Sequence, residues 1–401
     1  MLSLDFTKEL IGLKGIIVKN VVKLNRITEI EVELERKAQR CPCCGTATRT
    51  IHDYRWQKIK DIPSFGKHVI INLHKRRYRC PHCGKRFIED VDFLPSYHRM
   101  TNRLAAYVLA ELANECSFTS VSKRVNLSVS TVIRIFDFVN YGTPDLPEVL
   151  SIDEFKGNTG FDKYQVIITD PTTGRVLDIL PSRYSYKLIN YFKPMDRENV
   201  KFFVSDMWGI YYDLSKSFFK NAIPIIDKYH FIRQVVWAFE AVRKQEQKKF
   251  GKSHRIYFKR SKNLLIRKYD YLKEEEKQQV NVMLYTSVNL SSAYFLKEKF
   301  FEATKAKCKA EAKTLLYEWI ASALSSDLPQ FITCAKTYSN WSEPILNSFD
   351  FHYTNAFTEG CNNKIKILKR NAYGYRNFKR FRNRILHMFH NSYLEKQAAS
   401  A

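Results

Sequence analysis

The chain has 401 residues, 45% of them apolar, which is enough for more than one folded domain and argues against a disordered protein. Lysine and arginine outnumber aspartate and glutamate by 66 to 41, and the resulting net charge of +25 favours a polyanionic partner such as DNA or RNA. No stretch reaches the roughly 18 uninterrupted apolar residues of a membrane span, and the charged N-terminus lacks a signal-peptide core. We therefore expect a cytoplasmic protein that binds nucleic acid.

Residues 1–95 are predicted to form a zinc-ribbon domain. Alternating polar and apolar residues up to about residue 40 indicate a small hairpin, and two cysteine pairs with a following glycine come after it. In a reducing compartment such pairs are typical of a structural Zn²⁺ held by four thiolates. The predicted ligands are Cys41, Cys44, Cys80 and Cys83. Cys43 and His82 lie close by and remain alternative ligands, and the neighbouring Arg76 and Arg77 are predicted to face phosphate.

Residues 96–145 change to helical periodicity and predict a helix-turn-helix. Short helical patterns at 119–125 and 130–139 flank a turn, and Ser128 is placed to cap the second helix. The second helix of such a motif enters the major groove of DNA. Its predicted DNA contacts are Ser130, Thr131 and Arg134.

Residues 146–401 are predicted to form an α/β catalytic domain. Three strand-like runs, a helix, a strand, a helix and a strand follow one another between residues 149 and 226, which is typical of a ribonuclease-H-like core. Residues 231–345 are helical in pattern and are interpreted as an insertion into this core. The core then resumes with a helix at about 357–368.

Three carboxylates of this domain are candidate catalytic residues. Asp153 lies on the first predicted strand, Asp206 follows the fourth, and Glu359 begins the late helix. From 351 to 401 there are ten Lys or Arg residues and two acidic ones, so Glu359 stands in strongly basic surroundings. Three carboxylates can hold two Mg²⁺ or Mn²⁺ ions, which suits the cleavage of phosphodiesters.

The same helix and the chain that follows it are predicted to form a basic DNA-binding surface, which extends as far as Arg384. The expected contacts nearest Glu359 are Asn363, Lys366, Lys369 and Arg370.

Several residues near these positions have two interpretations. Glu154 competes with Asp153 but should point to the opposite side of its strand. Asp227 either lines the site, with His230 near DNA, or caps the following helix, and we leave both open. Trp237 and Trp319 either stack on unpaired bases or belong to the core.

These motifs together resemble the ISL-three family of bacterial insertion-sequence transposases, within the wider DDE class. The resemblance covers nearly the whole chain and is strongest in the last motif. It rests on Cys-Pro-Cys-Cys-Gly at 41–45, Arg-Arg-Tyr-Arg-Cys-Pro-His-Cys-Gly at 76–84, Ser-Ile-Asp-Glu-Phe at 151–155, Val-Ser-Asp-Met-Trp at 204–208, Asp-Lys-Tyr-His at 227–230 and Thr-Glu-Gly-Cys-Asn-Asn-Lys-Ile-Lys-Ile-Leu-Lys-Arg at 358–370.

The resemblance implies a catalytic triad of Asp153, Asp206 and Glu359 and a DNA transposase that acts on terminal inverted repeats. It also implies a dimer or larger assembly, because two transposon ends are paired, and a bacterial protein associated with the nucleoid when bound to double-stranded DNA. Two other functions remain open: a non-catalytic DNA-binding regulator derived from a transposase, and a ribonuclease-H-like nuclease without strand joining.

Overall fold

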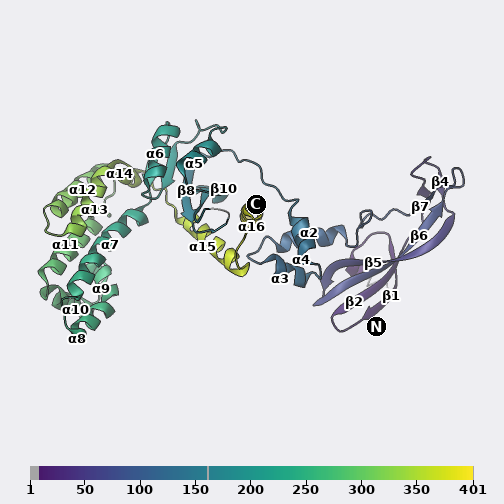
Figure 1. The fold of residues 1–401 in the computed structure, drawn as a ribbon, viewed down its shortest axis with the longest axis horizontal. Coiled ribbons are helices and arrows are strands. Elements are labelled where there is room, and N and C mark those ends of the chain that lie inside the picture. The colour runs from purple at the N-terminus through teal and green to yellow at the C-terminus, as the bar shows by residue number, and fades with distance from the viewer. Residues whose placement is uncertain (1–8, 160–161, 401) are drawn as a thin grey trace. The chain divides into compact units, whose positions relative to one another are not determined.

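The computed structural model describes residues 9–159 and 162–400 (Figure 1). These residues divide into two compact units. One contains the described residues up to Tyr141 together with those from Ile365 onward, and the other is Gly142–Lys364. Residues 365–401 had been predicted to belong to the catalytic domain, so the structure assigns the C-terminal segment differently. None of the helices within the described ranges is long and apolar enough to cross a membrane.

A five-stranded sheet forms the N-terminal part of the first unit. Strand β6 is central and pairs with β5 and β7 antiparallel and with β2 parallel, while β1 pairs with the outer side of β2. The strands are β1 (Ile16–Lys23), β2 (Ile27–Leu34), β5 (Ile51–Ser64), β6 (Lys67–Arg79) and β7 (Arg86–Ile88). One face buries apolar side chains that include Ile59 and Ile71, because strand residues alternate between the two faces. A short pair, β3 (Gln39–Arg40) and β4 (Ala47–Thr48), lies beside the first cysteine pair.

Three helices follow the sheet: α2 (Asn102–Glu111), α3 (Phe118–Arg124) and α4 (Val129–Phe136). Their apolar faces share one core that includes Leu104, Val121 and Val132. A side-chain oxygen caps each helix, and at α4 this is Ser128, which accepts from the Thr131 N–H at 3.2 Å.

The C-terminal helix α16 (Phe378–Ser400) packs on these three helices within the same unit. The buried Arg384 guanidinium donates to the backbone carbonyls of Leu112, Asn114 and Cys116, which follow α2. His387 contacts the Leu109 carbonyl and the Tyr141 hydroxyl, each at 2.9 Å. A helix distant in sequence therefore completes the helix-turn-helix bundle.

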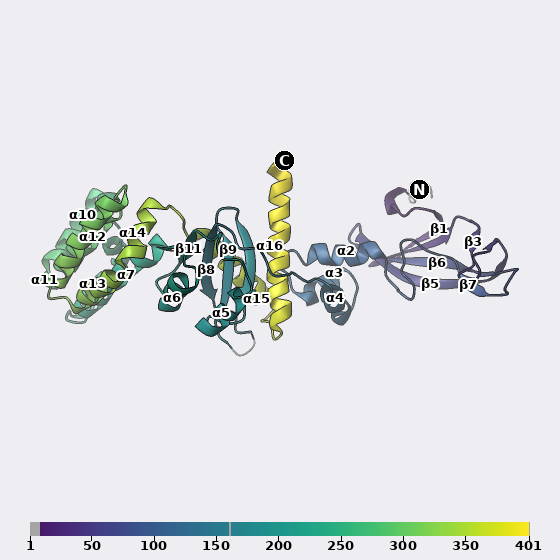
Figure 2. The ribbon, with the colours of Figure 1, turned by 90° about the horizontal axis from the view of Figure 1, so that it is seen from above.

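The second unit contains a mixed five-stranded sheet with the order β10–β9–β8–β11–β12 (Figures 1 and 2). The strands are β8 (Val149–Phe155), β9 (Gln165–Asp170), β10 (Arg175–Leu180), β11 (Phe202–Ser205) and β12 (Ile223–Ile226). The first three form an antiparallel meander, whereas β11 and β12 run parallel to β8. Parallel strands end at the same edge of a sheet, so β8, β11 and β12 bring their final residues together.

Helices cover this sheet. Helix α5 (Ser185–Phe192) and helix α6 (Gly209–Phe218) bury Leu188 and Tyr211 in one core with Phe203 of the sheet. A smaller cluster of Val149, Val204 and Ile225 lies on the alternate strand positions.

From Lys228 to Asp350 the second unit is helical (Figure 2). The helices are α7 (Lys228–Gln247), α8 (Lys252–Arg260), α9 (Lys262–Ile266), α10 (Glu274–Tyr285), α11 (Val288–Ala303), α12 (Lys309–Leu324), α13 (Pro329–Asn340) and α14 (Ser342–Asp350), with a single 3₁₀ turn at Tyr269–Tyr271. They bury one large core that includes Trp319, whose indole N–H donates to the Leu296 carbonyl. Asn347 of α14 donates to the Pro224 carbonyl, which ties the helices to β12. Helix α15 (Ala356–Asn371) then returns the chain to the sheet.

Candidate active site and zinc site

Four cysteine sulfurs converge in the first unit. The Sγ atoms of Cys41, Cys44, Cys80 and Cys83 all lie within 4.8 Å of one another. Individual separations are 3.6 Å between Cys41 and Cys83 and 3.5 Å between Cys44 and Cys80. A tetrahedral Zn²⁺ with Zn–S bonds of about 2.3 Å needs sulfurs about 3.8 Å apart, so this set fits a structural zinc ion. Four thiolates fill the coordination shell and leave no position for a substrate.

Each cysteine pair lies on the same kind of tight turn. The N–H of Gly45 donates to the Cys41 carbonyl, and the N–H of Gly84 donates to the Cys80 carbonyl. Both glycines have positive φ angles, of 73° and 70°, a conformation that side chains with a Cβ rarely adopt. Cys43 and His82 lie outside the cluster, and this decides between the alternatives that the sequence left open.

The predicted phosphate contact of Arg76 is wrong. Its guanidinium is buried, donates to the Leu34 carbonyl at 2.9 Å and pairs with the buried Glu89 at 3.3 Å. Arg76 is buried because β6 is the central strand of the sheet, and its inward-facing side chains have no access to solvent. Arg77 points to the other face, where it pairs with Asp53 at 3.1 Å.

In the second unit, two aspartates lie at the shared edge of parallel strands. Ser151 of β8 pairs with Val204 of β11, so Asp153 and Asp206, two residues further along, continue the same register. Asp153 is buried; its carboxylate accepts from the Asn362 amide at 2.8 Å and from the Glu154 N–H at 2.7 Å. One oxygen of Asp206, Oδ1, is buried and accepts no hydrogen bond from the described residues.

Helix α15 is fixed to this edge by a network of buried polar groups. The Ser151 hydroxyl lies 2.5 Å from the Asn355 side-chain oxygen and 3.0 Å from the Thr358 hydroxyl, which also contacts Thr169 at 2.7 Å. The backbone N–H of Asn355 donates to Asp227 at 2.7 Å. These contacts set the first turn of α15, and hence the position of Glu359, against three strands of the sheet.

Burial and neighbouring charges raise the pKa of both aspartates. For Asp153 burial dominates, with added repulsion from Asp206, Glu154 and Glu359, and the pKa rises to about 7. Burial is also the largest cause for Asp206, and repulsion by Glu154 adds to it. The guanidiniums of Arg233 and Arg183 lower the pKa of Asp206, which in balance is about 6. The carboxylates are thus close enough to affect one another's ionisation, and a bound cation would favour their charged forms.

Further charged and titratable side chains lie around the three carboxylates. His230 Nε2 lies 3.6 Å from Glu359 Oε1, and burial lowers the pKa of His230 despite the nearby charge of Asp227. Glu154 is bound by Arg183 at 2.7 Å from each carboxylate oxygen, and this guanidinium lies over the rings of Tyr164 and Trp208.

Asp227 is the N-cap of α7 and accepts from the Tyr229 N–H at 2.8 Å, so the capping interpretation is confirmed.

The sequence was compared with known protein families. A profile described as an ISL3-type DDE transposase matches residues 150–385, which is more than half of the chain. The chain belongs to the ISL3 family of transposases. Residues 37–83 of this transposase match the zinc finger of the transposases of IS204, IS1001, IS1096 and IS1165. Residues 89–140 match the helix-turn-helix domain of the ISL3 transposase family. The resemblance noted from the motifs is therefore confirmed, and so is the domain order of zinc ribbon, helix-turn-helix and DDE domain.

One relative that spans most of the chain is also named a transposase. The transposase is 25% identical to the transposase for insertion sequence element IS1001 of Bordetella parapertussis over 88% of this chain and 89% of the relative. It is also 34% identical to a protein named ATP-dependent protease from Lactococcus lactis subsp. lactis. That second match covers 27% of this chain and 33% of the relative, and it says nothing about the rest of the transposase.

The remaining predicted contacts of the transposase lie at the surface. Ser130 and Arg134 of α4 are exposed, while Thr131 is half-buried and its hydroxyl contacts Ser128 at 2.8 Å. Of the predicted DNA-binding residues on α15, Asn363, Lys366 and Arg370 are exposed and Lys369 is half-buried.

Sequence reasoning missed the buried partners of the transposase site. Asn362 was not predicted to bind a carboxylate, but it is buried and its amide donates to Asp153. Thr358, Ser151 and Asn355 were not singled out at all. The spacing of three residues between Glu359 and Asn362, which places both on one helical face, was the available signal.

Proposed function

We propose that this transposase binds the terminal inverted repeats of its insertion sequence and cuts and joins DNA at Asp153, Asp206 and Glu359, on a ribonuclease-H-like core. The observation that carries this is the position of two aspartates at one sheet edge, with a helix that presents Glu359 there. Asp153 is buried in β8, and Asp206 is half-buried directly after the parallel strand β11. The strand order, an antiparallel meander followed by two parallel strands, supports the ribonuclease-H-like interpretation.

The donor set suits divalent cations. Asp206 Oδ1 is buried without a hydrogen-bond donor among the described residues, and both aspartates carry raised pKa values that a cation would lower. Asp153, Asp206 and Glu359 would hold two Mg²⁺ or Mn²⁺ ions, since these prefer carboxylate oxygens and share substrate phosphates. When bound, such ions lower the pKa of water and stabilise charge on the oxygens of the scissile phosphate.

The reaction proceeds in two displacements at phosphorus. A water oxygen attacks the phosphodiester at the transposon end, the bond from phosphorus to the 3′-oxygen breaks, and a 3′-hydroxyl and a 5′-phosphate result. The 3′-hydroxyl then attacks a target phosphodiester, joins the transposon to the target 5′-phosphate and releases a target 3′-hydroxyl. Asn362 orients the Asp153 carboxylate, and the Arg183 and Arg233 guanidiniums favour ionised Asp206.

DNA recognition falls to the first unit. The side chains of Ser130 and Arg134 are exposed on α4, which supports contacts with base edges in the major groove. Arg77 and the zinc ribbon would contact phosphates. The exposed basic residues of α15 would also contact phosphates. Because two transposon ends must be paired, we expect the active form on DNA to be a homodimer or a larger assembly.

The test uses an end-labelled fragment that carries the boundary of the insertion sequence, incubated with the purified full chain and Mg²⁺ or Mn²⁺. The proposal expects metal-dependent nicking at the boundary and a strand-transfer product with target DNA. Asp206→Ala should abolish both and leave specific binding nearly unchanged, whereas Asp213→Ala, which removes an exposed carboxylate of α6, should behave as the wild type. Binding without cutting would favour the regulator, and nicking without joining would favour a nuclease.

A further inference from the structure

Helix α7 carries a row of exposed and half-buried side chains that begins at the candidate active site. Tyr229, Arg233 and Trp237 are spaced four residues apart, so they lie one above another on the same face of the helix. Tyr229 is 54% exposed and Trp237 is 51% exposed, whereas Trp319 is fully buried. Trp319 therefore belongs to the core, as one of its two interpretations expected, and Trp237 is available to a ligand.

Arg233 links these two aromatic rings. Its guanidinium carbon lies 5.2 Å from the centroid of the Tyr229 ring and 4.6 Å from that of the Trp237 ring, a cation–π arrangement on both sides. The Arg233 charge also favours the ionised form of Asp206, so the row starts within electrostatic reach of the carboxylates. His230, on the same turn as Tyr229, approaches Glu359.

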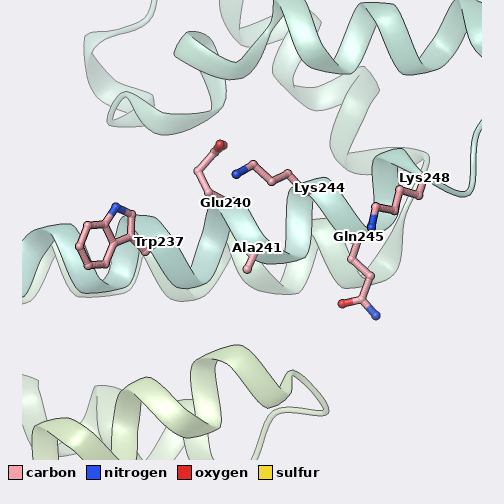
Figure 3. Close-up of a pocket in the computed structure, with 6 residues that line it drawn as sticks. All are labelled: Trp237, Glu240, Ala241, Lys244, Gln245 and Lys248. Carbon is pink, nitrogen blue, oxygen red and sulfur yellow. The ribbon is translucent and has the colours of Figure 1, made fainter.

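Beyond Trp237 the helix lines an open hollow of about 450 Å³ (Figure 3). Its lining residues are Trp237, Glu240, Ala241, Lys244, Gln245 and Lys248. The one carboxylate, Glu240, is buried and bonded to Arg243 at 2.6 Å, so its charge is largely neutralised. Lys244 and Lys248 are exposed and form no ion pair with the carboxylates of the described residues, and the hollow is therefore net positive.

We propose that this face of α7 binds unpaired nucleotides of the DNA strand that passes through the active site. A base stacks on the exposed indole of Trp237, and the adjoining phosphates lie beside Lys244 and Lys248. This rests on the proposed function, because the strand must first reach the carboxylates. Exposed aromatic rings between cationic side chains are the usual means by which proteins hold single strands, since every base offers a flat face to stack. A protein partner would need a larger apolar area than Trp237 and Ala241 supply.

The experiment compares two end-labelled fragments of the transposon boundary without added Mg²⁺, one fully paired and one with a short unpaired tail at the cleavage position. Trp237→Ala should weaken binding of the tailed fragment by about 5-fold to about 100-fold, the effect usual for one stacked base, and leave the paired fragment unaffected. Trp237→Phe should weaken it less. Tyr285→Ala, which removes a 95% exposed ring on α10, is the matched control and should change neither.

Three outcomes would overturn the inference. The first is an equal affinity of the wild-type protein for both fragments, which needs no variant and does not depend on the folding of one. The second is an unchanged preference in folded Trp237→Ala. The third is a change in the number of associated chains in this variant without a change in its DNA affinity. That result would assign this face of α7 to contact with a second copy of the protein. Failure of the proposed function looks different: the wild type then cuts no boundary fragment with Mg²⁺, whatever its preference for tails.

Discussion

The raised pKa of Asp153 makes a quantitative prediction about stability. In the unfolded chain an aspartate ionises near pH 3.8, whereas burial and its neighbours raise the pKa of Asp153 to about 7 in the folded protein. The folded state therefore binds the proton more tightly, and stability falls as pH rises from about 4 to about 7. The difference between the two pKa values corresponds to a loss of about 4 kcal/mol in the free energy of unfolding at pH 8 without a cation.

Asp153→Asn should remove this penalty. The asparagine oxygen can still accept from the Glu154 N–H, and Asn362 can rotate so that its Oδ1, which is buried and accepts from no described residue, accepts from the new amide. We therefore expect metal-free Asp153→Asn to be more stable than the wild type by about 2–4 kcal/mol at pH 8 and by roughly 1–2 kcal/mol at pH 5. Added Mg²⁺ should stabilise the wild type more than the variant, because binding to the folded state shifts the unfolding equilibrium.

Urea unfolding followed by tryptophan fluorescence provides the assay, since all five tryptophans except Trp56 lie between Gly142 and Lys364. Buffers should be stripped of free metal on a resin rather than with a strong chelator, which would also remove zinc. Asp213→Asn, at an exposed position of the same unit, is the control and should match the wild type at both pH values. The reasoning is refuted if Asp153→Asn gains no stability at pH 8, or if its gain is the same at pH 5 and pH 8.

Three other predictions concern the rest of the chain. Cys80→Ala should reduce bound zinc below one ion per chain by elemental analysis and loosen the N-terminal sheet by proteolysis, while Cys43→Ala should change neither. Arg384→Met should destabilise the unit that contains α16 by about 2–4 kcal/mol in thermal unfolding, because it leaves buried carbonyls without a donor; an unchanged midpoint would contradict this. Asn362→Ala removes a donor to the Asp153 carboxylate, so the acid limb of the cleavage pH profile should move to higher pH, and a profile that only falls in height would argue against an electrostatic role.

The order of elements in the second unit could be predicted from the sequence because its strands are short apolar runs with clear turn signals. Between Val149 and Ile226 the structure has three strands, a helix, a strand, a helix and a strand, in the predicted order. The cysteine ligands were equally accessible, since glycine after each pair marks a turn with positive φ. Local patterns of this kind need no knowledge of distant contacts.

Contacts between distant segments could not be predicted in this way. Arg384 was assigned to an exposed basic surface because it lies among other arginines, but it is fully buried against carbonyls at the end of α2. Arg76 was misplaced for the same reason, since its partner Glu89 comes from another strand region. A basic residue is predicted to be exposed unless its acceptor is known, and here both acceptors come from other parts of the chain.

The docking of α16 on the helix-turn-helix has a consequence for how the protein is made. His387 contacts Tyr141, which precedes it by 246 residues, so the DNA-binding bundle needs residues from both ends of the chain. At a synthesis rate of about 5–20 residues per second, these residues emerge from the ribosome roughly ten to fifty seconds apart. The catalytic unit is therefore synthesised before the bundle can be completed. A chain truncated after its first 141 residues would lack the helix that completes this bundle, so we expect it to bind DNA more weakly than a chain that contains α16.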